Sequence, residues 1–593
     1  TPAHDFNDFE VGKRHNLPLI NILNPDATLN ENTPFAGMDT QSARKATIAK
    51  LEELGFMEKI EDHPMVIPYG DRSNVVIEPM LTDQWFVDAP TLAKEAIRAV
   101  EDGEMQFVPK SYEKTYFEWM RNIQPWCISR QLWWGHQMPI WYGPDGEIFC
   151  EENEEEAQAA ADRHYGSRVE LTRETDVLDT WFSSGLWAFS TLGWPDKSEY
   201  LDTFYPTSVL VTGFDIIFFW VARMIMAGYE YEGKMPFKNV YFTGIVRDKL
   251  GRKMSKSLGN SPDPLDLIDK YGADGVRVGM LLCAPAGGDL LFDESLPEQG
   301  RNFTTKMWNA FKLVKSWEVA SIDQPAHSRL ALEWFKHLLG KVNETLNTQF
   351  DQYRISEALM TVYTTFRDEF SSWLLEMIKP AYGQPIDRKT YEETLNIFEQ
   401  LLQLLHPFMP FITEEIWQTL RERQDGESIM ISRLPKATSY DESYLLRFEA
   451  VKNIIVGIRN IRKQNNIAFK DVLELKVKKN ERYPASFDSI IRKMGNIGQI
   501  GLVNEPVKGA WSFIADTVEY FIPAQGEVNT AEVKAKLEEE LNYTRGFLTS
   551  VMKKLSNEKF VNGAPEQVVA NERKKQADAE VKIAAIEAQL KGL

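Results

Sequence analysis

The stretch from Gly251 to Asn260 (GRKMSKSLGN) combines residue types that can handle a polyphosphate. Lys253 and Lys256 stand three apart, with the hydroxyl of Ser255 between them. Lysine is a compact cation on a flexible stem, so two lysines on one loop can close over phosphate groups. A generic basic cluster is more often a solvated loop, but the string Lys-Met-Ser-Lys-Ser favours nucleotide chemistry. It is not a P-loop, because the chain has no Gly-x4-Gly-Lys-Ser/Thr.

Two short apolar runs that precede this loop are predicted to be buried strands, at residues 209–212 and 240–243. Residues 216–229 between them have a helical pattern. Gly213 and Asp215 follow the first run directly, at the strand end where ligands bind in open parallel sheets. A strand, a helix and a strand leading into a cationic loop predict an α/β catalytic domain.

The composition indicates a large multidomain protein. At 593 residues the chain should hold about three to five domains. Its net charge of −20 argues against nonspecific coating of nucleic acid, although local patches still permit a specific RNA partner. Three widely spaced cysteines predict neither a disulfide framework nor a zinc cluster and fit the cytoplasm. We expect no membrane span and no signal peptide.

The second half of the chain is predicted to be largely helical. Residues 301–440 have apolar groups at helical spacing, with a new helix starting at Thr413. Residues 441–525 mix one helix with short strands. That helix carries Arg459, Arg462 and Lys463, a candidate face for an RNA backbone, although a solvated face is equally consistent.

Residues 530–593 contain two runs with apolar groups at alternating spacings of three and four, separated by a turn at 562–565. This pattern predicts an antiparallel coiled coil. The segment has 11 basic and 10 acidic residues in a chain that is strongly acidic, which suits contact with RNA. A plain dimerisation helix is the alternative.

Five strings together resemble the valyl-tRNA synthetases, a family of class I aminoacyl-tRNA synthetases, over essentially the whole chain. The related isoleucyl enzymes usually carry cysteine zinc signatures and a different string around position 181, and neither is present. The five strings are residues 4–15 (HDFNDFEVGKRH), 129–136 (SRQLWWGH), 176–184 (DVLDTWFSS), 215–220 (DIIFFW) and 253–257 (KMSKS).

The resemblance implies that this lysine loop binds ATP. Lys253, Ser255 and Lys256 would be catalytic, with Met254 beside them at the nucleotide. They would stabilise the phosphates as valine attacks magnesium-bound ATP to give valyl-adenylate and pyrophosphate. No protein-bound metal is expected.

Other positions gain roles from the same resemblance. Gly213 and Asp215 would lie against the ATP ribose or the amino acid. Trp181, Ile216 and Trp220 would wall the valine side chain, and Ile216 and Trp220 are four apart, as on one helical face.

An editing site is also implied, because an apolar pocket cannot strongly reject threonine, and valyl enzymes are the standard illustration of this limit. Thr1, Asp5 and Asp8 match the end of the editing motif that hydrolyses threonyl-tRNA.

The resemblance also divides the chain into regions. The expected fold is multidomain, α/β plus all-α: residues 1–65 as the remnant of the editing domain, 66–300 as part of a Rossmann-like catalytic core, 301–440 as a helical anticodon-binding bundle, 441–525 as an α/β junction, and 526–593 as a coiled-coil tRNA-binding arm. The family's His-Ile-Gly-His signature is absent, so we expect the C-terminal two-thirds of a synthetase.

The predicted function is that of a valine–tRNA ligase, with tRNA(Val), valine and ATP as partners, no DNA, and a monomeric state. One alternative is a ligase for isoleucine or leucine. The other is a noncatalytic tRNA-binding protein derived from a synthetase, against which the intact lysine loop argues.

Overall fold

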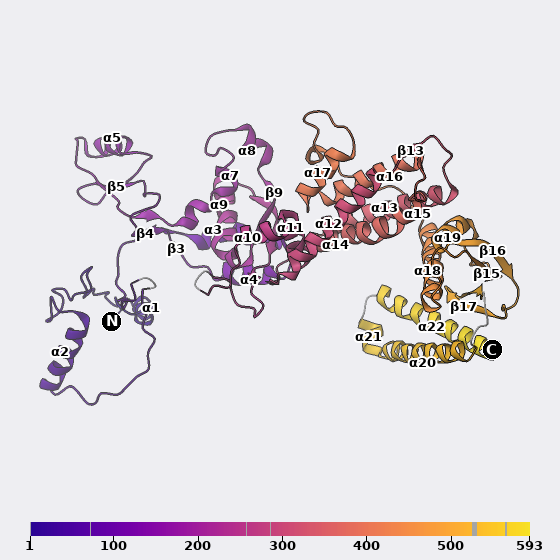
Figure 1. Ribbon diagram of the computed structural model, residues 1–593. Helices are drawn as coiled ribbons and strands as arrows, with labels where there is room; N and C mark the ends of the chain where they lie inside the picture. Colours follow the sequence, from indigo (N-terminus) through magenta and orange to yellow (C-terminus); the bar gives the residue numbers. More distant parts are fainter. Residues whose placement is uncertain are drawn as a thin grey trace. The chain divides into compact units, whose positions relative to one another are not determined.

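The computed structural model describes residues 2–70, 73–255, 258–284, 286–524, 530–563 and 566–592. Its internal contacts divide the chain into two compact units, whose elements are labelled in Figure 1. The first unit holds Thr1–Gln106, Glu113–Ser208 and Ile216–Lys238, and the second holds Phe107–Tyr112, Val209–Asp215 and Asn239–Leu593. Within the described ranges, no helix is both long and apolar enough to cross a lipid bilayer.

The N-terminal part of the first unit is built on two helices, α1 (Phe6–His15) and α2 (Thr40–Glu53). Asp39 caps α2 by accepting from Gln41 N at 3.0 Å and Ser42 N at 2.8 Å, which satisfies amides that the helix itself leaves unpaired.

Short strands and helices make up the middle of the first unit. The strands form three small sheets, β1 with β3, β4 with β8, and β6-β5-β7. The strands are β1 (Phe86–Val87), β3 (Trp126–Cys127), β4 (Ser129–Arg130), β5 (Ile140–Tyr142), β6 (Ile148–Cys150), β7 (Thr172–Arg173) and β8 (Val177–Leu178). The helices are α3 (Ala89–Glu101), α4 (Tyr112–Arg121), α5 (Glu154–Tyr165), α6 (Thr180–Ser184), α7 (Trp187–Ser190) and α8 (Glu199–Phe204).

The helix predicted at 216–229 is not a regular α-helix from its start. A 3₁₀ turn at Phe214–Ile216 leads into a π-helical turn at Ile217–Val221, and α9 (Ala222–Glu232) follows. A π turn inserts one extra residue per turn, so it changes which side chains share a face. Helix α9 packs against α3, where Ala89, Ala96 and Ala99 are completely buried.

The second unit begins with a three-stranded sheet in the order β2-β10-β9. Both predicted strands are present, as β9 (Thr207–Gly213) and β10 (Phe237–Thr243), with β2 (Gln106–Val108) alongside. The burial predicted for residues 209–212 is wrong for half of them, because Leu210 and Thr212 are buried whereas Val209 and Val211 are exposed. Thr207 N donates to Pro236 O at 3.0 Å and Thr243 Oγ1 donates to Thr212 O at 3.4 Å, so β9 and β10 run parallel. After β10, β11 (Val246–Arg247) pairs in parallel with β12 (Leu290–Leu291).

The region predicted to be helical at 301–440 is a bundle around one continuous core. Phe335, Phe366, Phe370 and Phe398 are completely buried in it. Its helices, with those leading into it, are α10 (Pro264–Tyr271), α11 (Ala273–Leu282), α12 (Ser295–Lys315), α13 (Ala326–Asp351), α14 (Ile355–Thr364), a π segment (Thr365–Leu374), α15 (Leu375–Ile378), α16 (Arg388–Leu405) and α17 (Pro410–Leu420). The short parallel pair β13 (Val319–Ala320) and β14 (Ile386–Asp387) joins two of its loops.

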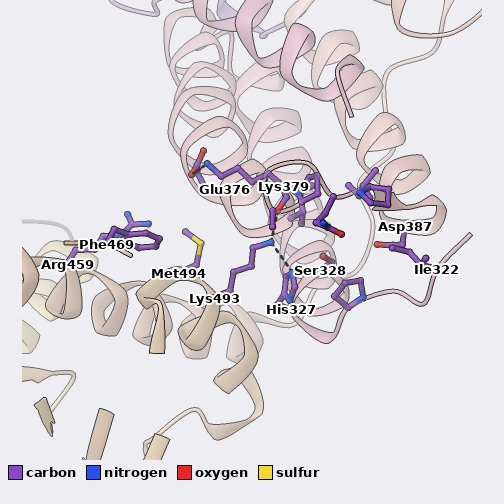
Figure 2. Close-up of a pocket in the computed structure, with 17 residues that line it drawn as sticks. Ile322, His327, Ser328, Glu376, Lys379, Asp387, Arg459, Phe469, Lys493 and Met494 are labelled. Carbon is purple, nitrogen blue, oxygen red and sulfur yellow. Dashed lines mark hydrogen bonds and ion pairs between the residues drawn. The ribbon is translucent and has the colours of Figure 1, made fainter. Parts of the chain in front are cut away.

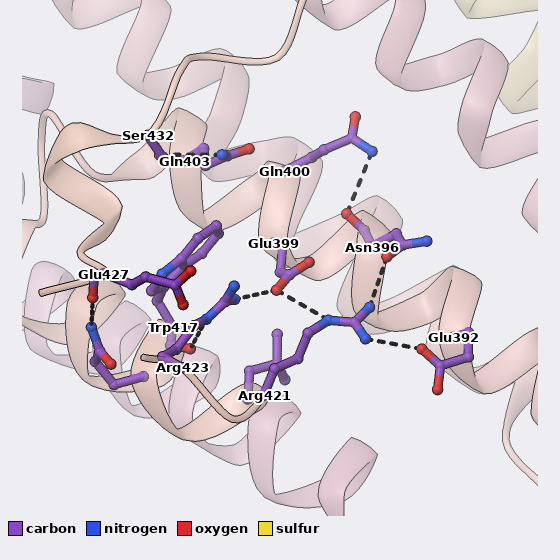
Figure 3. Close-up of polar contacts among 12 residues, drawn as sticks. Glu392, Asn396, Glu399, Gln400, Gln403, Trp417, Arg421, Arg423, Glu427 and Ser432 are labelled. Atoms are coloured by element: carbon purple, nitrogen blue, oxygen red, sulfur yellow. Dashed lines mark hydrogen bonds and ion pairs between the residues drawn. The ribbon is translucent and has the colours of Figure 1, made fainter. Parts of the chain in front are cut away.

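Figure 3 shows how the segment after α17 is fastened to α16. Glu399 accepts from Arg421 Nε at 3.1 Å and also from Arg423, while Arg421 Nη2 donates to Asn396 Oδ1 at 2.7 Å. The Arg423 guanidinium lies 3.9 Å from the ring centre of Trp417. These contacts fix the end of the bundle through charge-assisted hydrogen bonds as well as apolar packing.

Helix α17 corrects one prediction, because it starts at Pro410 rather than at Thr413. Proline suits the first helical position, where its missing N–H leaves nothing unpaired. The buried Asp274 of α11 supplies the cap, accepting from Ile412 N at 2.6 Å and Phe411 N at 3.4 Å. Thr413 is completely buried and donates to Met409 O at 2.7 Å. A cap 138 residues away leaves no local sequence signal.

Residues 441–525 form an α/β module. The mixed sheet has the order β16-β15-β18-β17, in which only β15 and β16 are parallel. Its elements are α18 (Glu442–Gln464), β15 (Leu473–Lys478), α19 (Asp488–Gly495), β16 (Ile497–Val503), β17 (Ala510–Ala515) and β18 (Val518–Pro523). The helix and strand expected here are confirmed.

The C-terminal segment folds as two long helices, α20 (Thr530–Leu555) and α22 (Glu566–Gly592), with α21 (Glu558–Gly563) between them (Figure 1). Arg545 pairs with Glu587 at 2.6 Å and Lys554 with Glu572 at 3.8 Å, so α20 and α22 run antiparallel. The apolar positions of both repeats include buried side chains, namely Leu541, Val551, Val569, Ala579 and Ile586.

Arg462 holds the α/β module together from inside. Only 5% of the residue is exposed, and its Nη2 donates to Asp471 O at 2.8 Å and Gly495 O at 2.9 Å, while Nη1 donates to Ala468 O at 2.8 Å. The guanidinium therefore ties α18 to the turns before β15 and after α19.

Replacing Arg462 with methionine should lower the free energy of unfolding by about 2–4 kcal/mol, because buried carbonyls lose their donors. Urea unfolding followed by circular dichroism measures this. The matched control is Lys463→Met, at an exposed neighbour, which should change stability by less than about 0.5 kcal/mol. Equal effects of the two substitutions would contradict this role of Arg462.

Candidate active site

The lysine loop follows β11 and is organised by Asp248, which is 9% exposed. Its carboxylate accepts from Leu250 N at 3.0 Å, Arg252 N at 2.9 Å, Arg252 Nε at 2.7 Å and Asn260 Nδ2 at 3.0 Å. These hydrogen bonds, that of Asn260 first, hold the pKa of the Asp248 carboxyl far below its usual range. A charged Asp248 therefore closes the turn that presents the lysine.

Asn260 anchors the C-terminal end of the loop to the same Asp248 carboxylate. Its Oδ1 accepts from Ser255 N at 2.9 Å and its Nδ2 donates to Lys253 O at 3.2 Å. Met254 packs against an apolar cluster that includes Leu267. The backbone of residues 253–255 is thus held on both sides, while the Lys253 side chain is exposed.

Lys256, predicted to be the second phosphate-binding lysine, lies outside the described residues. Asp248 and Asn260 were not among the predicted site residues. Asn260 ends the basic string and Asp248 lies three residues before it, but only the folded loop shows that they share one hydrogen-bond network.

The predicted pair Gly213 and Asp215 lies at the carboxyl end of β9, as expected. A Cβ on Gly213 would lie 2.7 Å from Asp215 Oδ1, so the glycine leaves room for the carboxylate. Asp215 is exposed, and Phe214 between them stacks on Tyr112 with ring centres 5.5 Å apart. The aspartate can therefore accept hydrogen bonds from a ligand beyond the strand end.

The predicted valine-pocket residues belong to the first unit. Trp181 stacks with Phe219 at 5.9 Å, and Trp220 contacts Trp187 at 5.8 Å. Trp220 Nε1 also donates to Ser184 O at 3.0 Å. The two predicted tryptophans therefore have separate aromatic partners.

Ile216 is half-buried at the junction of the 3₁₀ and π turns. Phe219, beside Trp181, was missed because its partner lies on another helix, α6, and sequence spacing does not relate the two.

A buried cation supports this aromatic group. The Arg223 guanidinium lies 3.9 Å from the ring centre of Trp126 and 4.6 Å from that of Phe218, and the residue is 7% exposed. Burial lowers the pKa of Arg223 to about 10, against the opposing effect of Asp179. Arg223 therefore stays charged at neutral pH and holds the π turn between aromatic rings.

The predicted editing residues lie at α1. Asp5 caps this helix by accepting from Asn7 N and Asp8 N, each at 2.9 Å. Asp8 lies in the first helical turn, and Thr1 is outside the described residues. His4 is engaged on both ring nitrogens, with Pro79 O at 2.7 Å and with Ile22 N, which donates at 2.9 Å.

The predicted RNA face on α18 needs correction at Arg462. This side chain is buried and donates to backbone carbonyls, so it is not available to a phosphate. Arg459 and Lys463 are exposed, and the Arg459 guanidinium lies 5.4 Å from the ring centre of Trp373.

Arg459 borders a cavity of about 830 Å³ in the second unit, shown in Figure 2. Lys493 Nζ donates to Lys379 O at 2.7 Å and lies 3.1 Å from His327 Nε2. Burial, followed by the charge of Lys379, lowers the pKa of Lys493 to about 8, and burial lowers that of His327 to about 4. At neutral pH the imidazole is thus neutral and the ammonium charged. Phe469 and Met494 give the cavity apolar walls.

In the part of the chain that the structure describes, no group of three or more His, Cys, Asp or Glu side chains could hold a metal ion.

Three family models match the chain. The model for class I tRNA synthetases (I, L, M and V) matches residues 7–293, that for the anticodon-binding domain of tRNA ligase matches 333–477, and that for the valyl tRNA synthetase tRNA binding arm matches 529–593.

Curated relatives match over the full length of the chain. It is 54% identical to the valine–tRNA ligase of Phocaeicola vulgatus, covering 100% of this chain and 68% of that protein. For the same enzyme of Parabacteroides distasonis the identity is 53%, with 100% and 69% covered. A solved methionyl-tRNA synthetase of Mycobacterium tuberculosis with methionyl-adenylate is 17% identical, covers 63% of this chain and 70% of that chain, and has a TM-score of 0.45.

The α/β domain with its lysine loop, followed by a helical bundle, together with the matched models, identifies a class I aminoacyl-tRNA synthetase. Within that class, the identity to curated relatives shows that the chain belongs to the valine–tRNA ligase family.

Replacing Asp248 with alanine should free the lysine loop, because four donors lose one acceptor. Hydrogen exchange at the amides of Leu250 and Arg252 should accelerate at least about tenfold. Mass spectrometry of the peptide that carries both amides measures this without any activity assay. Asp293→Ala, which removes the partner of exposed Lys249, is the control and should leave these amides unchanged. Unchanged exchange in Asp248→Ala would contradict the role of the carboxylate.

Proposed function

We propose that this chain activates valine with ATP and transfers it to tRNA(Val). The observation that carries the proposal is the lysine loop held by Asp248 and Asn260 in a member of the valine–tRNA ligase family. The valine carboxylate attacks the α-phosphorus of magnesium-bound ATP, which forms valyl-adenylate and releases pyrophosphate. A ribose hydroxyl of the tRNA end then attacks the valyl carbonyl and releases AMP.

In this reaction Lys253 and Lys256 stabilise the negative charge that moves onto the leaving pyrophosphate. Preplaced cations meet that charge without reorganising, which is the usual source of rate enhancement in phosphoryl chemistry. Ser255 donates to a phosphate oxygen beside them, with Met254 anchoring the loop. Magnesium enters with ATP as part of the substrate.

The amino acid lies among aromatic side chains. Trp181, Ile216 and Trp220 wall the valine side chain, with Phe219 stacked on Trp181 to fix its ring. Asp215 accepts from the ammonium group of valine or a ribose hydroxyl, and Gly213 lets either approach the backbone.

Editing of threonyl-tRNA is part of the proposal. Thr1, Asp5 and Asp8 would take part in it, with Asp8 the better partner for the substrate ammonium, because Asp5 already caps α1.

Replacing Lys253 with alanine should lower valine-dependent exchange of pyrophosphate into ATP by about 10²–10³-fold, as the loss of one transition-state donor does. The matched control is Lys249→Ala, an exposed lysine four residues away that pairs with Asp293 at 2.6 Å. It should retain activity within about twofold, because it lies outside the motif.

The same assay separates the alternatives. Exchange supported by isoleucine or leucine and not by valine would assign a different ligase. A loss below about threefold in Lys253→Ala would remove this lysine from the mechanism. A protein that binds tRNA but exchanges no pyrophosphate with any of the three amino acids would be a noncatalytic binder.

The second unit provides the RNA contacts in this proposal. The helical bundle binds the anticodon side of tRNA(Val), and α20 and α22 form an antiparallel coiled coil that braces the tRNA elbow. Arg459 and Lys493 supply cations at the cavity of Figure 2, and Lys463 supplies another from the exposed side of α18. The protein acts as a cytoplasmic monomer.

Raising the pH from 7 to 9 should weaken tRNA binding, because Lys493 is charged below its pKa of about 8 and neutral above it. Lys493→Met should bind about fivefold more weakly at pH 7, and its salt slope should fall by about 1, if the ammonium contacts a phosphate. Fluorescence anisotropy with labelled tRNA at fixed salt measures both. Lys508→Met, at an exposed lysine outside the cavity lining, is the control. An equal pH dependence in Lys493→Met and the unsubstituted protein would contradict the contact.

A further inference from the structure

The amine of Lys493 lies at the cavity of Figure 2 without an opposite charge beside it. The residue belongs to α19 and is half-buried. Its Nζ donates to Lys379 O at 2.7 Å and lies 3.1 Å from His327 Nε2, so both of its contacts are with uncharged groups at neutral pH. Among the described residues, no carboxylate forms an ion pair with this ammonium.

The carboxylates that line the same cavity are engaged elsewhere. Glu376 pairs with the ammonium of Lys379 at 2.6 Å, and Asp387 caps α16 through its side chain. Burial is the first cause that lowers the pKa of Lys493 to about 8, the charge of Lys379 adds to it, and Glu376 opposes it. The surroundings of Lys493 therefore favour the neutral amine more than those of a surface lysine do.

A neutral amine is a nucleophile, whereas an ammonium is not. About a tenth of Lys493 is neutral at pH 7, compared with about one part in three thousand for a lysine with the ordinary pKa of 10.5. A lysine that burial and a neighbouring cation make less basic is activated for attack on a carbonyl carbon. The contacts with His327 and with the carbonyl of Lys379 hold the nitrogen in one place at the cavity.

The cavity has room for a reactant beside this amine. Its volume is about 830 Å³, and its walls include Phe469, Met494 and three prolines. Such walls accept a small apolar group. Arg459 lines the cavity as well, and its guanidinium stacks on Trp373 rather than pairing with an acid. A reactant with a short apolar acyl group and a phosphate that the guanidinium attracts matches both features.

We propose that Lys493 is a site of covalent acylation, at which an acyl phosphate transfers its acyl group to Nζ. The neutral nitrogen attacks the acyl carbon, and an amide C–N bond forms. The bond between the acyl carbon and the phosphate oxygen breaks, and the phosphate leaves with the electron pair and takes up the proton that the amine loses. The product has no charge at Nζ. That this modification weakens tRNA binding rests on the proposed function, whereas the acylation itself does not.

The first test treats the 593-residue chain with acetyl phosphate and follows acetylation of individual lysines by mass spectrometry of peptides. At pH 7 Lys493 should react at least about tenfold faster than Lys508, an exposed lysine outside the cavity lining. Its rate should rise with pH and level off above about pH 8, where the amine is mostly neutral. A Lys493 rate equal to or below that of Lys508 at pH 7 would overturn the proposal.

A second variant separates the reactivity of the amine from mere access to it. Lys379→Met keeps the backbone carbonyl that holds Nζ but removes the neighbouring charge and frees Glu376, so the pKa of Lys493 should rise. Acetylation of Lys493 at pH 7 should slow at least about threefold, which corresponds to about half a pKa unit, and should be unchanged at pH 10. Lys389→Met, at an exposed lysine outside the cavity lining, is the control and should change neither rate. An unchanged rate at pH 7 in Lys379→Met would contradict the proposed activation.

Anisotropy with labelled tRNA then distinguishes the site from its consequence. Treatment with acetyl phosphate should weaken tRNA binding more in the unsubstituted protein than in Lys493→Met, because only the former loses a charge at position 493. Equal weakening of the two, with Lys493 fully acetylated, would contradict the tRNA contact in the proposed function and leave the acylation site standing. Failure of Lys493 to react would contradict the acylation site whatever tRNA binding shows.

Discussion

The Asp248 carboxylate is the group on which the candidate phosphate site depends. It accepts hydrogen bonds from two backbone amides, one guanidinium and one carboxamide, all within 3.0 Å. Through Asn260 the same network reaches the backbone of Lys253 and Ser255. A loop rich in cations is thereby closed around one internal anion, which offsets the repulsion among them. The side chain of Lys253 remains at the surface while its backbone is fixed.

In the aromatic group of the first unit the central charge has the opposite sign, because a buried cation rather than an anion holds its neighbours. There a buried cation, Arg223 of α9, lies between the rings of Trp126 and of Phe218 in the π turn, and Asp179 caps the helix that carries Trp181. Each candidate site is thus organised by one ionised side chain that contacts no substrate in the proposed mechanism. Local hydrogen bonds or ring contacts offset the free-energy cost of burying these charges, and the same contacts hold the neighbouring residues in place.

Regular periodicity made much of the fold predictable. The strands at 209–212 and 240–243, the helices of residues 301–440 and the helix and strand of the α/β module follow directly from apolar spacing. Long-range contacts were not predictable from spacing. Asp274 caps α17 from 138 residues away. Arg462 has the spacing of a surface arginine, but its side chain is buried and donates to the backbone carbonyls of Asp471 and Gly495.

The candidate site was predictable where it rests on a contiguous string, as at Lys253 and at Gly213 with Asp215. Phe219 was missed because its stacking partner, Trp181, lies on another helix, and Arg223 was missed because an isolated arginine in an apolar run gives no sign of its aromatic partners. The roles of individual site residues stay predictions.

The Asp274 cap has a mechanical consequence. Helices α10 and α11 follow the lysine loop in the chain, whereas α17 belongs to the bundle proposed to bind RNA. Two hydrogen bonds from α17 end on one carboxylate of α11, and Arg277 adds a third contact by donating to Phe408 O at 3.1 Å. While these bonds persist, a displacement of α17 pulls on α11. Through these contacts a movement of α17 in the bundle is transmitted to α11, which follows the lysine loop in the chain.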